Sequence, residues 1–288
     1  MAAPNAFSVQ RMNRIKDSIF FVNIIPRADH IEEIRELIAT AAHVPPSRRA
    51  ALLNGDGHVA TGFVVDDGPV HLKILTCAHI VAHVFTAESP LSRNDANRLF
   101  STNVLCDHYE ASFRQPGQNV HHQRVYAQGQ IIGINCRKDL MLIRVRRTDV
   151  MDLDHTCTRN HPPLAFSSTH PVAFDDCAMI SWPPLRHRTC VRGCVSHVSR
   201  SFDDLGRDNP VGYQINLMEV KIASEDGSSG APLLNGNGKV IGMLHGGYGG
   251  AFSFFLRLND IIYFLAQRAV PIRKFSHSVR NILVFIIL

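Results

Sequence analysis

Short apolar runs separated by turn-forming residues fill the chain from Val59 to about Phe255. Clusters of Gly, Pro, Asp and Asn stand between these runs. Many short β-rich runs with turn residues between them are typical of antiparallel barrels. At 288 residues and 45% hydrophobic, the chain is long enough for two barrels that pack into one unit, with extensions. The pattern therefore predicts an all-β fold.

Glycines flank a pair of serines in the stretch 225–232 (EDGSSGAP). A serine hydroxyl is a poor nucleophile unless a base takes its proton and donors hold the resulting anion. Glycine lets the backbone turn tightly enough to point N–H groups at one place. Ser229 is the candidate nucleophile, and the N–H groups of Gly227 and Ser229 are the candidate oxyanion hole. Taken alone, the string is equally compatible with an ordinary turn.

Two distant segments supply partners for such a serine. His79 directly follows a strand-like apolar run that contains Leu72 and Ile74, and Asp139 stands at the head of the apolar run 140–143. Intervals of roughly 60 and 90 residues suit a base and its orienting acid in one barrel and a nucleophile in a second. The chain order His, Asp, Ser is that of one group of serine hydrolases and differs from that of the others. Together, the three segments predict a catalytic triad.

These motifs resemble those of the trypsin-like peptidase superfamily, and most closely the protease domain of its Do-like (HtrA-type) branch. The matching segments are 60–65 (ATGFVV), 76–79 (TCAH), 139–143 (DLMLI), 191–196 (VRGCVS), 227–232 (GSSGAP) and 239–243 (KVIGM). The resemblance implies two six-stranded antiparallel β-barrels of the chymotrypsin-like fold, with the catalytic cleft between them. It also implies that His79 is the general base, Asp139 the residue that orients it and Ser229 the nucleophile.

The resemblance divides the chain into an N-terminal extension 1–54, a protease domain 55–266 and a C-terminal tail 267–288. In the extension, apolar residues from Ile31 to Ile38 share one helical face and predict an amphipathic helix that ends before Pro45. A second helix is expected to close the protease domain. Members of this branch commonly carry PDZ domains after the protease, and the short tail does not support regulation by such a domain.

The stretch between the candidate base and acid is long and polar. It includes the polar segments 93–98 and 115–124. Long polar connections of this kind usually lie on the surface. We therefore expect an extended surface loop there.

Specificity in this fold is set by residues about six before the nucleophile and by the strand that follows it. Ala223 takes the first place, so no acidic side chain is expected to receive a basic P1 residue. Gly246 and Gly247 leave room for a substrate backbone to pair as an extra strand. His245 lies on a strand where glutamate- and glutamine-cleaving relatives place a histidine, but alternation turns it toward the other face. The four residues are expected to border the substrate site, with a small or aliphatic P1 residue, and a strand-exposed or internally bonded role is favoured for His245.

The charge balance excludes one class of partner. Lys and Arg number 30 against 25 Asp and Glu, which gives a net charge of +5 without a long charged run. Such a mild excess is typical of a solvated surface, so nucleic acid is not expected to bind. The apolar C-terminal run 281–288 is too short to span a bilayer, which takes about 20 residues. Protein or peptide substrates are the expected partners, no cofactor is expected, and family likeness leaves a homo-oligomer open.

Cysteine usage bears on the compartment. The seven cysteines are odd in number and irregularly spaced, which favours a reducing, intracellular and preferably cytoplasmic location. Charged residues interrupt any long apolar core in the first 25 residues, so no cleavable signal is expected, whereas organellar import stays open.

No metal site is predicted, because no spacing resembles the paired ligands of a zinc site. Cys190 and Cys194 fit alternating strand positions better than a disulfide bridge or a metal pair. Four histidines in polar, loop-like sequence are expected at the surface: His108, His121, His122 and His155.

Three functions are compatible with these residues. The first is a serine endopeptidase that works through an acyl-enzyme intermediate. The second is a protease-shaped binding or scaffold protein with weak or no activity, and the third is an esterase that uses the same triad.

Overall fold

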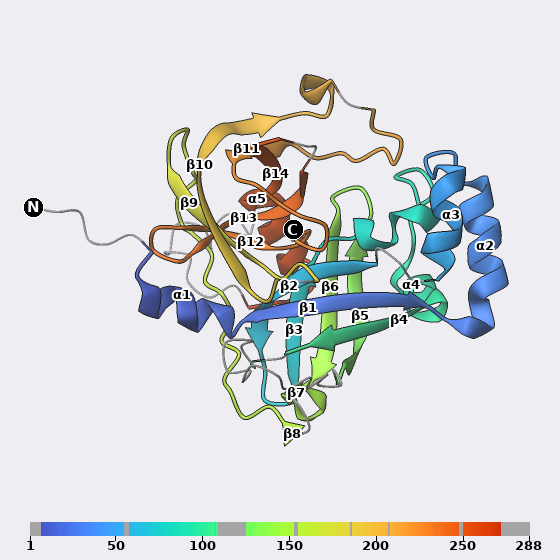
Figure 1. Cartoon of the computed structure of the whole chain (residues 1–288), viewed down its shortest axis with the longest axis horizontal. Helices are drawn as coiled ribbons and strands as arrows, with labels where there is room; N and C mark the ends of the chain where they lie inside the picture. Colours follow the sequence, from blue (N-terminus) through green and yellow to red (C-terminus); the bar gives the residue numbers. More distant parts are fainter. Residues whose placement is uncertain are drawn as a thin grey trace, which may run out of the picture.

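The structure is a computed structural model that describes residues 7–54, 58–106, 108, 125–152, 155–184, 186–206, 208–247 and 250–271. Two closed barrels, each of six antiparallel strands, form its centre (Figure 1). The first barrel runs β1-β2-β3-β6-β5-β4, with β1 Ile19–Pro26, β2 Val59–Asp67, β3 His71–Thr76, β4 Phe100–Leu105, β5 Ala127–Asn135 and β6 Leu140–Arg146. The second runs β10-β11-β14-β13-β12-β9, with β9 Asp176–Ser181, β10 Thr189–Arg200, β11 Leu217–Lys221, β12 Pro232–Asn235, β13 Val240–Gly247 and β14 Phe252–Arg257. The predicted fold class is confirmed.

The first strand of the first barrel comes from the segment predicted to be an extension. β1 pairs with β2 on one side and with β4 on the other, and it thereby closes the barrel. Its sequence, IFFVNIIP, is apolar almost throughout, and Ile19, Phe20 and Val22 are fully buried. The structure therefore corrects the boundary predicted at residue 55, because the barrel needs residues 19–26 to close.

Helices cover the ends and flanks of the barrels. They are α1 Val9–Lys16, α2 Ile31–Thr40, α3 Pro46–Leu53, α4 Arg93–Leu99 and α5 Leu258–Ala266, with 3-10 turns η1 Ala28–His30, η2 His79–Val84, η4 Arg147–Asp149 and η5 Asp203–Leu205. The predicted amphipathic helix is α2, which buries Ile34 and Ile38 and ends before the prolines. Pro46 then opens α3, because proline is well suited to the first turn of a helix. The predicted closing helix is α5.

The described part of the expected surface loop between His79 and Asp139 contains a helix, so the expectation of a loop is wrong over residues 93–98. The segment forms α4, because the Ser92 side chain accepts a hydrogen bond from the Asp95 N–H at 3.1 Å and caps the helix. Residues 115–124 and the apolar run 281–288 lie outside the described residues. A small two-stranded sheet, β7 Met151–Asp152 and β8 His155–Thr156, follows the first barrel in sequence.

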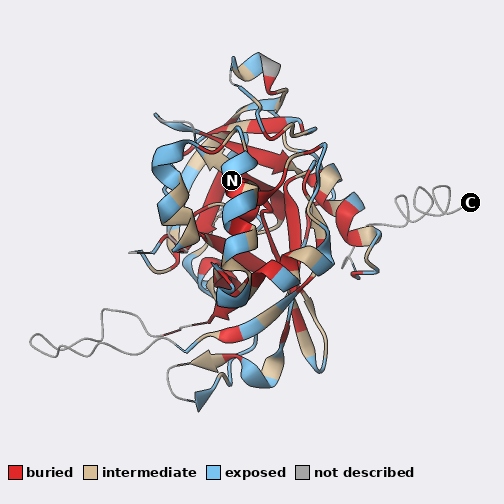
Figure 2. Cartoon of the chain, turned by 90° about the vertical axis from the view of Figure 1, so that its right-hand side faces the viewer, coloured by how far each residue is buried: buried red, intermediate tan, exposed pale blue. Residues whose placement is uncertain are grey.

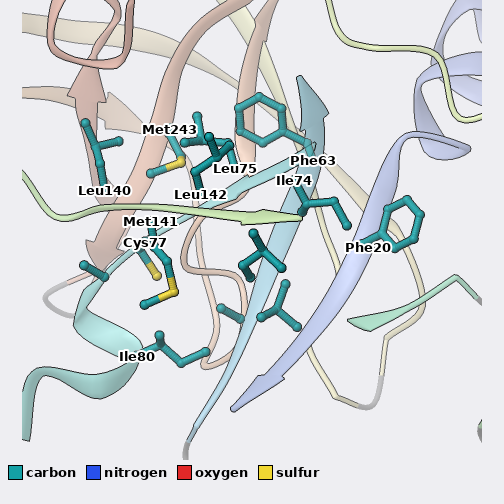
Figure 3. Close-up of a cluster of buried hydrophobic side chains, with 14 of the residues drawn as sticks. Phe20, Phe63, Ile74, Leu75, Cys77, Ile80, Leu140, Met141, Leu142 and Met243 are labelled. Atoms are coloured by element: carbon teal, nitrogen blue, oxygen red, sulfur yellow. The ribbon is translucent and has the colours of Figure 1, made fainter. Parts of the chain in front are cut away.

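Buried apolar side chains fill both barrels and the space between them. Figure 2 shows that buried residues concentrate in the strands, whereas helices expose their outer faces. One cluster includes Phe63 and Leu142 of the first barrel and Met243 of the second (Figure 3). Because close-packed interiors resist deformation, this shared core fixes how the two barrels face each other.

Candidate active site

The loop between β11 and β12 carries Ser229. Gly227 and Gly230 have φ angles of +85° and +83°, in the left-handed region that favours glycine. A Cβ atom on Gly230 would lie 2.3 Å from the carbonyl oxygen of Thr61. The two glycines that flank the serine pair are therefore required for the loop to turn and to pack against the first barrel.

Thr61 of β2 holds this loop from the opposite barrel. Its N–H donates to the carbonyl oxygen of Ser229 at 2.8 Å, and its hydroxyl donates to that of Gly227 at 2.9 Å. The same hydroxyl accepts from the N–H of Trp182 at 2.8 Å. The shape of the nucleophile loop therefore depends on the docking of the two barrels.

His79 and Asp139 form a two-point contact. His79 begins η2, separated from the end of β3 by two residues, and its backbone N–H donates to Oδ1 of Asp139 at 2.7 Å. Its ring Nδ1 lies 2.7 Å from Oδ2 of the same carboxylate. Asp139 is fully buried and has a φ angle of +55°, a conformation that Asp adopts more readily than most residues. The structure thus brings together the base and acid proposed from the sequence.

The charges in this contact act on both pKa values. Burial, the largest single effect, lowers the pKa of His79, but the Asp139 carboxylate and the Cys77 side chain together outweigh it and hold the pKa well above its ordinary value. Burial raises the pKa of Asp139, whereas the neighbouring His79 and His245 outweigh it and hold that pKa well below its usual range. Asp139 therefore stays ionised and favours the protonated form of His79.

A second imidazole contacts the same carboxylate. Nδ1 of His245 lies 2.5 Å from Oδ2 of Asp139, and the side chain is buried. The pairing of β13 with β14 shifts register between Leu244 and Gly246, and we attribute the direction of His245 to this bulge. His245 is internally bonded and is not exposed on its strand. Counting alternate residues could not find this contact, because a bulge resets the alternation.

Ser229 lies at the same place, partly exposed. Its hydroxyl donates to the carbonyl oxygen of His245 at 3.4 Å, and within the described part of the chain it makes no hydrogen bond to His79. The N–H groups of Gly227 and Ser229 have no acceptor among the described residues, so both are available to a ligand oxygen.

A cleft passes these side chains and extends to the N-terminal helices. Besides His79, Ser229 and His245 it is lined by residues of the α2–α3 region, including His43, Arg48 and Leu52. Nε2 of His43 lies 2.7 Å from the carbonyl oxygen of Ala82, which fixes this region to η2. The sequence offered no signal for this role, because the resemblance did not extend to residues 1–54.

The predicted specificity residues divide into two groups. Gly246 and Gly247 line the cleft together with His245, whereas Ala223 is exposed and its neighbour Ser224 lines the cleft instead. The hydroxyl of Ser224 accepts a hydrogen bond from that of the buried Ser253 at 2.8 Å. The preferred P1 residue stays a prediction.

The predictions for the cysteines agree with the structure, whereas those for the remaining histidines agree only in part. All seven cysteines are free, and Cys190 and Cys194 lie on β10 as predicted. His155 is exposed as predicted, but His108 is buried, so the expectation of a surface position for it is wrong. His121 and His122 lie outside the described residues.

Two clusters in the described part of the chain have the spacing of metal ligands. One is His79, Asp139 and His245, in which Oδ2 of Asp139 lies within hydrogen-bond distance of both imidazoles. The other joins Cys106, His108, Cys157 and His161, away from the cleft.

Two six-stranded barrels, with a His–Asp pair and a glycine-flanked serine in the cleft, are the arrangement of a trypsin-like peptidase. The family model of the trypsin-like peptidase domain matches residues 60–243, and the chain belongs to this family. The family predicted from the sequence is confirmed.

Solved structures share the fold at low sequence identity. The active form of the Rv3671c protease from M. tuberculosis is 14% identical with a TM-score of 0.55, over 94% of this chain and 93% of that one. The crystal structure of Deg5 is 18% identical with a TM-score of 0.54, over 88% of this chain and 90% of that one. No curated protein matches the chain. Among the described residues, no helix combines the length and the apolar character that a membrane span requires.

Proposed function

We propose that this protein is a serine endopeptidase that hydrolyses peptide bonds through His79, Asp139 and Ser229. The two-point contact between His79 and Asp139, in the cleft that also holds the Ser229 hydroxyl, carries the proposal. Because Nδ1 of His79 faces the carboxylate, a reacting hydroxyl would use Nε2, which lies 3.6 Å from Sγ of Cys77. The family supports a peptidase, and the serine nucleophile and the activity itself are our inference.

In the proposed reaction, the Ser229 hydroxyl rotates from the His245 carbonyl to Nε2 of His79 when a peptide enters the cleft. His79 takes the hydroxyl proton as Oγ attacks the scissile carbonyl, and the N–H groups of Gly227 and Ser229 hold the oxyanion. His79 then gives the proton to the leaving amine. A water molecule then attacks the acyl-enzyme: His79 takes the proton of the water and returns it to Oγ of Ser229 as the acid product leaves. Asp139 fixes the imidazole throughout.

One observation favours a second candidate, a weakly active or inactive binding protein. The hydroxyl of Ser229 contacts the His245 carbonyl and not His79. Catalytic hydrogen bonds are often long or misaligned before substrate binds, so the observation fits a resting peptidase as well. Peptide binding without acylation would favour the second candidate. An esterase that uses the same triad would be distinguished by comparing ester and amide substrates.

Labelling with a fluorophosphonate probe tests the proposal. We expect the wild-type protein to be labelled and both Ser229→Ala and His79→Ala to lose labelling, because the probe reports an activated serine. Ser228→Ala is the matched control: this adjacent serine is buried, and its hydroxyl contacts that of Ser181 at 3.2 Å. Labelling that persists in Ser229→Ala, or a folded wild-type protein that is never labelled, would count against the proposal.

The rate of this labelling is expected to depend on pH through His79. The neutral imidazole is the form that accepts the Ser229 proton, and Asp139, together with Cys77, raises the pKa of His79 well above its ordinary 6.5. The rate constant should therefore fall as the pH is lowered, with a midpoint above 6.5. Measurement of the rate constant across the neutral range checks this. A midpoint at or below the ordinary value would contradict the assigned effect of Asp139.

A further inference from the structure

Four potential metal ligands from separate segments converge beside the first barrel. Cys106 and His108 directly follow β4, Cys157 follows β8, and His161 lies on the way to β9. Figure 1 shows β7 and β8 at the end of this barrel, where β4 leads toward them. The ligand atoms, two Sγ and two imidazole nitrogens, all lie within 4.8 Å of one another.

The separations approach those of a tetrahedron around one zinc ion. Sγ of Cys106 lies 3.5 Å from Sγ of Cys157, 2.9 Å from Nε2 of His108 and 3.2 Å from Nε2 of His161. Bonds of about 2.3 Å to sulfur and about 2.0–2.1 Å to nitrogen give tetrahedral edges of about 3.3–3.8 Å. Small side-chain adjustments therefore suffice to place one ion at the bonding distance appropriate to each of the four atoms.

Both imidazoles are held with Nε2 toward the sulfurs, and the same residue holds them. Nδ1 of His161 lies 2.6 Å from the carbonyl oxygen of Asp17, so Nδ1 carries the proton and donates to it. Nδ1 of His108 lies 3.3 Å from the Asp17 carboxylate. Metal-bound histidines almost always donate their second nitrogen to a carboxylate or a backbone carbonyl in this way. Asp17 supplies both kinds of acceptor.

Burial and chemistry fit a closed structural site. Cys106 and His161 are each 1% exposed and His108 is 8% exposed, while Cys157 is partly buried. The two sulfurs are free thiols and not a disulfide. Two thiolates and two neutral imidazoles are a ligand set typical of structural zinc, and four protein ligands leave no position for a substrate.

We propose that Cys106, His108, Cys157 and His161 bind one structural Zn²⁺ ion in tetrahedral geometry. Each thiol releases its proton to solvent when the ion binds, so two negative sulfurs balance the charge of the ion. The ion would join the end of β4 to the segment that leads into the second barrel. This inference does not depend on the proposed peptidase activity.

Metal analysis of the full chain, prepared without a histidine tag, tests the proposal. We expect about one zinc per chain, and X-ray absorption should show two sulfur neighbours at about 2.3 Å and two nitrogen neighbours at about 2.0–2.1 Å. Chelation should lower the melting temperature, and added Zn²⁺ should restore it. A protein that takes up no zinc, or that binds zinc through nitrogen and oxygen alone, would overturn the site.

A pair of serine variants locates the ion. Cys157→Ser should lose most of the bound zinc and the effect of chelation on melting, whereas Cys190→Ser, at an exposed thiol on β10, should keep both. Zinc retained at the wild-type level by a folded Cys157→Ser protein would refute the ligand set. If that variant does not fold, X-ray absorption of the wild-type protein still decides the outcome, because it counts the sulfur neighbours directly.

Discussion

Asp139→Asn is expected to lower kcat/KM for peptide hydrolysis by about 10⁴-fold while leaving the protein folded. Asn tolerates the left-handed conformation at this position about as well as Asp does. The carboxylate, however, accepts from the His79 N–H through Oδ1 and faces two imidazoles through Oδ2. An amide offers only one oxygen in place of these two.

Neither orientation of the new amide preserves the base. If its nitrogen takes the place of Oδ2, His79 must accept at Nδ1 and carry its proton on Nε2, where it cannot receive the Ser229 proton. If its nitrogen takes the place of Oδ1, two N–H donors face each other, and the hydrogen bond from the His79 backbone N–H is lost. Steady-state kinetics on a fluorogenic peptide from library profiling, with Asp149→Asn at an exposed position as the control, measures the effect. A loss of less than tenfold would show that Asp139 does not orient the base.

Gly230→Ala is expected to destabilise the folded protein by about 2–5 kcal/mol. The φ angle of +83° costs an L-residue roughly 1–2 kcal/mol. A Cβ atom would also lie 2.3 Å from the Thr61 carbonyl oxygen and 2.5 Å from the Thr76 hydroxyl, which forces the barrels apart. Such overpacking typically costs about 1–3 kcal/mol more.

Urea denaturation of the variant separates these two costs when two other glycines are changed in parallel. Gly206→Ala carries the strain of a positive φ angle, but its Cβ atom would have no neighbour within 4 Å. Gly246→Ala has neither a positive φ angle nor a neighbour within 4 Å of its Cβ atom. We expect the free energy of unfolding to fall most for Gly230→Ala, less for Gly206→Ala and least for Gly246→Ala. Equal unfolding midpoints for the three variants would contradict the close approach of the barrels at Gly230.

The sequence predicted those parts of the site that rest on local motifs. The strand before His79, the apolar run after Asp139 and the glycines around Ser229 each have a local signature, and their order and spacing along the chain indicated the barrels to which they belong. β1 was missed because its nearly continuous apolar run precedes the recognised motifs. A strand of this kind is identified by its partners, which are set by the closed barrel.

Other features arise from contacts that no local pattern encodes. His245 contacts Asp139 at a β-bulge, and a count of alternate residues cannot register a bulge. The Cys–His cluster joins segments about 50 residues apart, with one residue between Cys106 and His108 but three between Cys157 and His161. This unequal spacing does not resemble two copies of one metal-binding motif, so the cluster is recognised only in the folded structure. The residues of the α2–α3 region that line the cleft could not be predicted for the same reason, because their role depends on where the two helices pack against the barrels.

The position of β1 has a consequence for a chain that is still being synthesised. All six strands of the first barrel lie between residues 19 and 146, so this barrel is complete in sequence well before Ser229 is made. Domains generally fold as units during synthesis, beginning with the N-terminal one. A nascent chain can therefore form the His79–Asp139 contact before Ser229 is made, and Thr61 has no loop to bind until the second barrel docks. In the proposed reaction, a nascent chain that ends before Ser229 has no serine to attack a peptide bond and cannot cleave its neighbours on the same polysome.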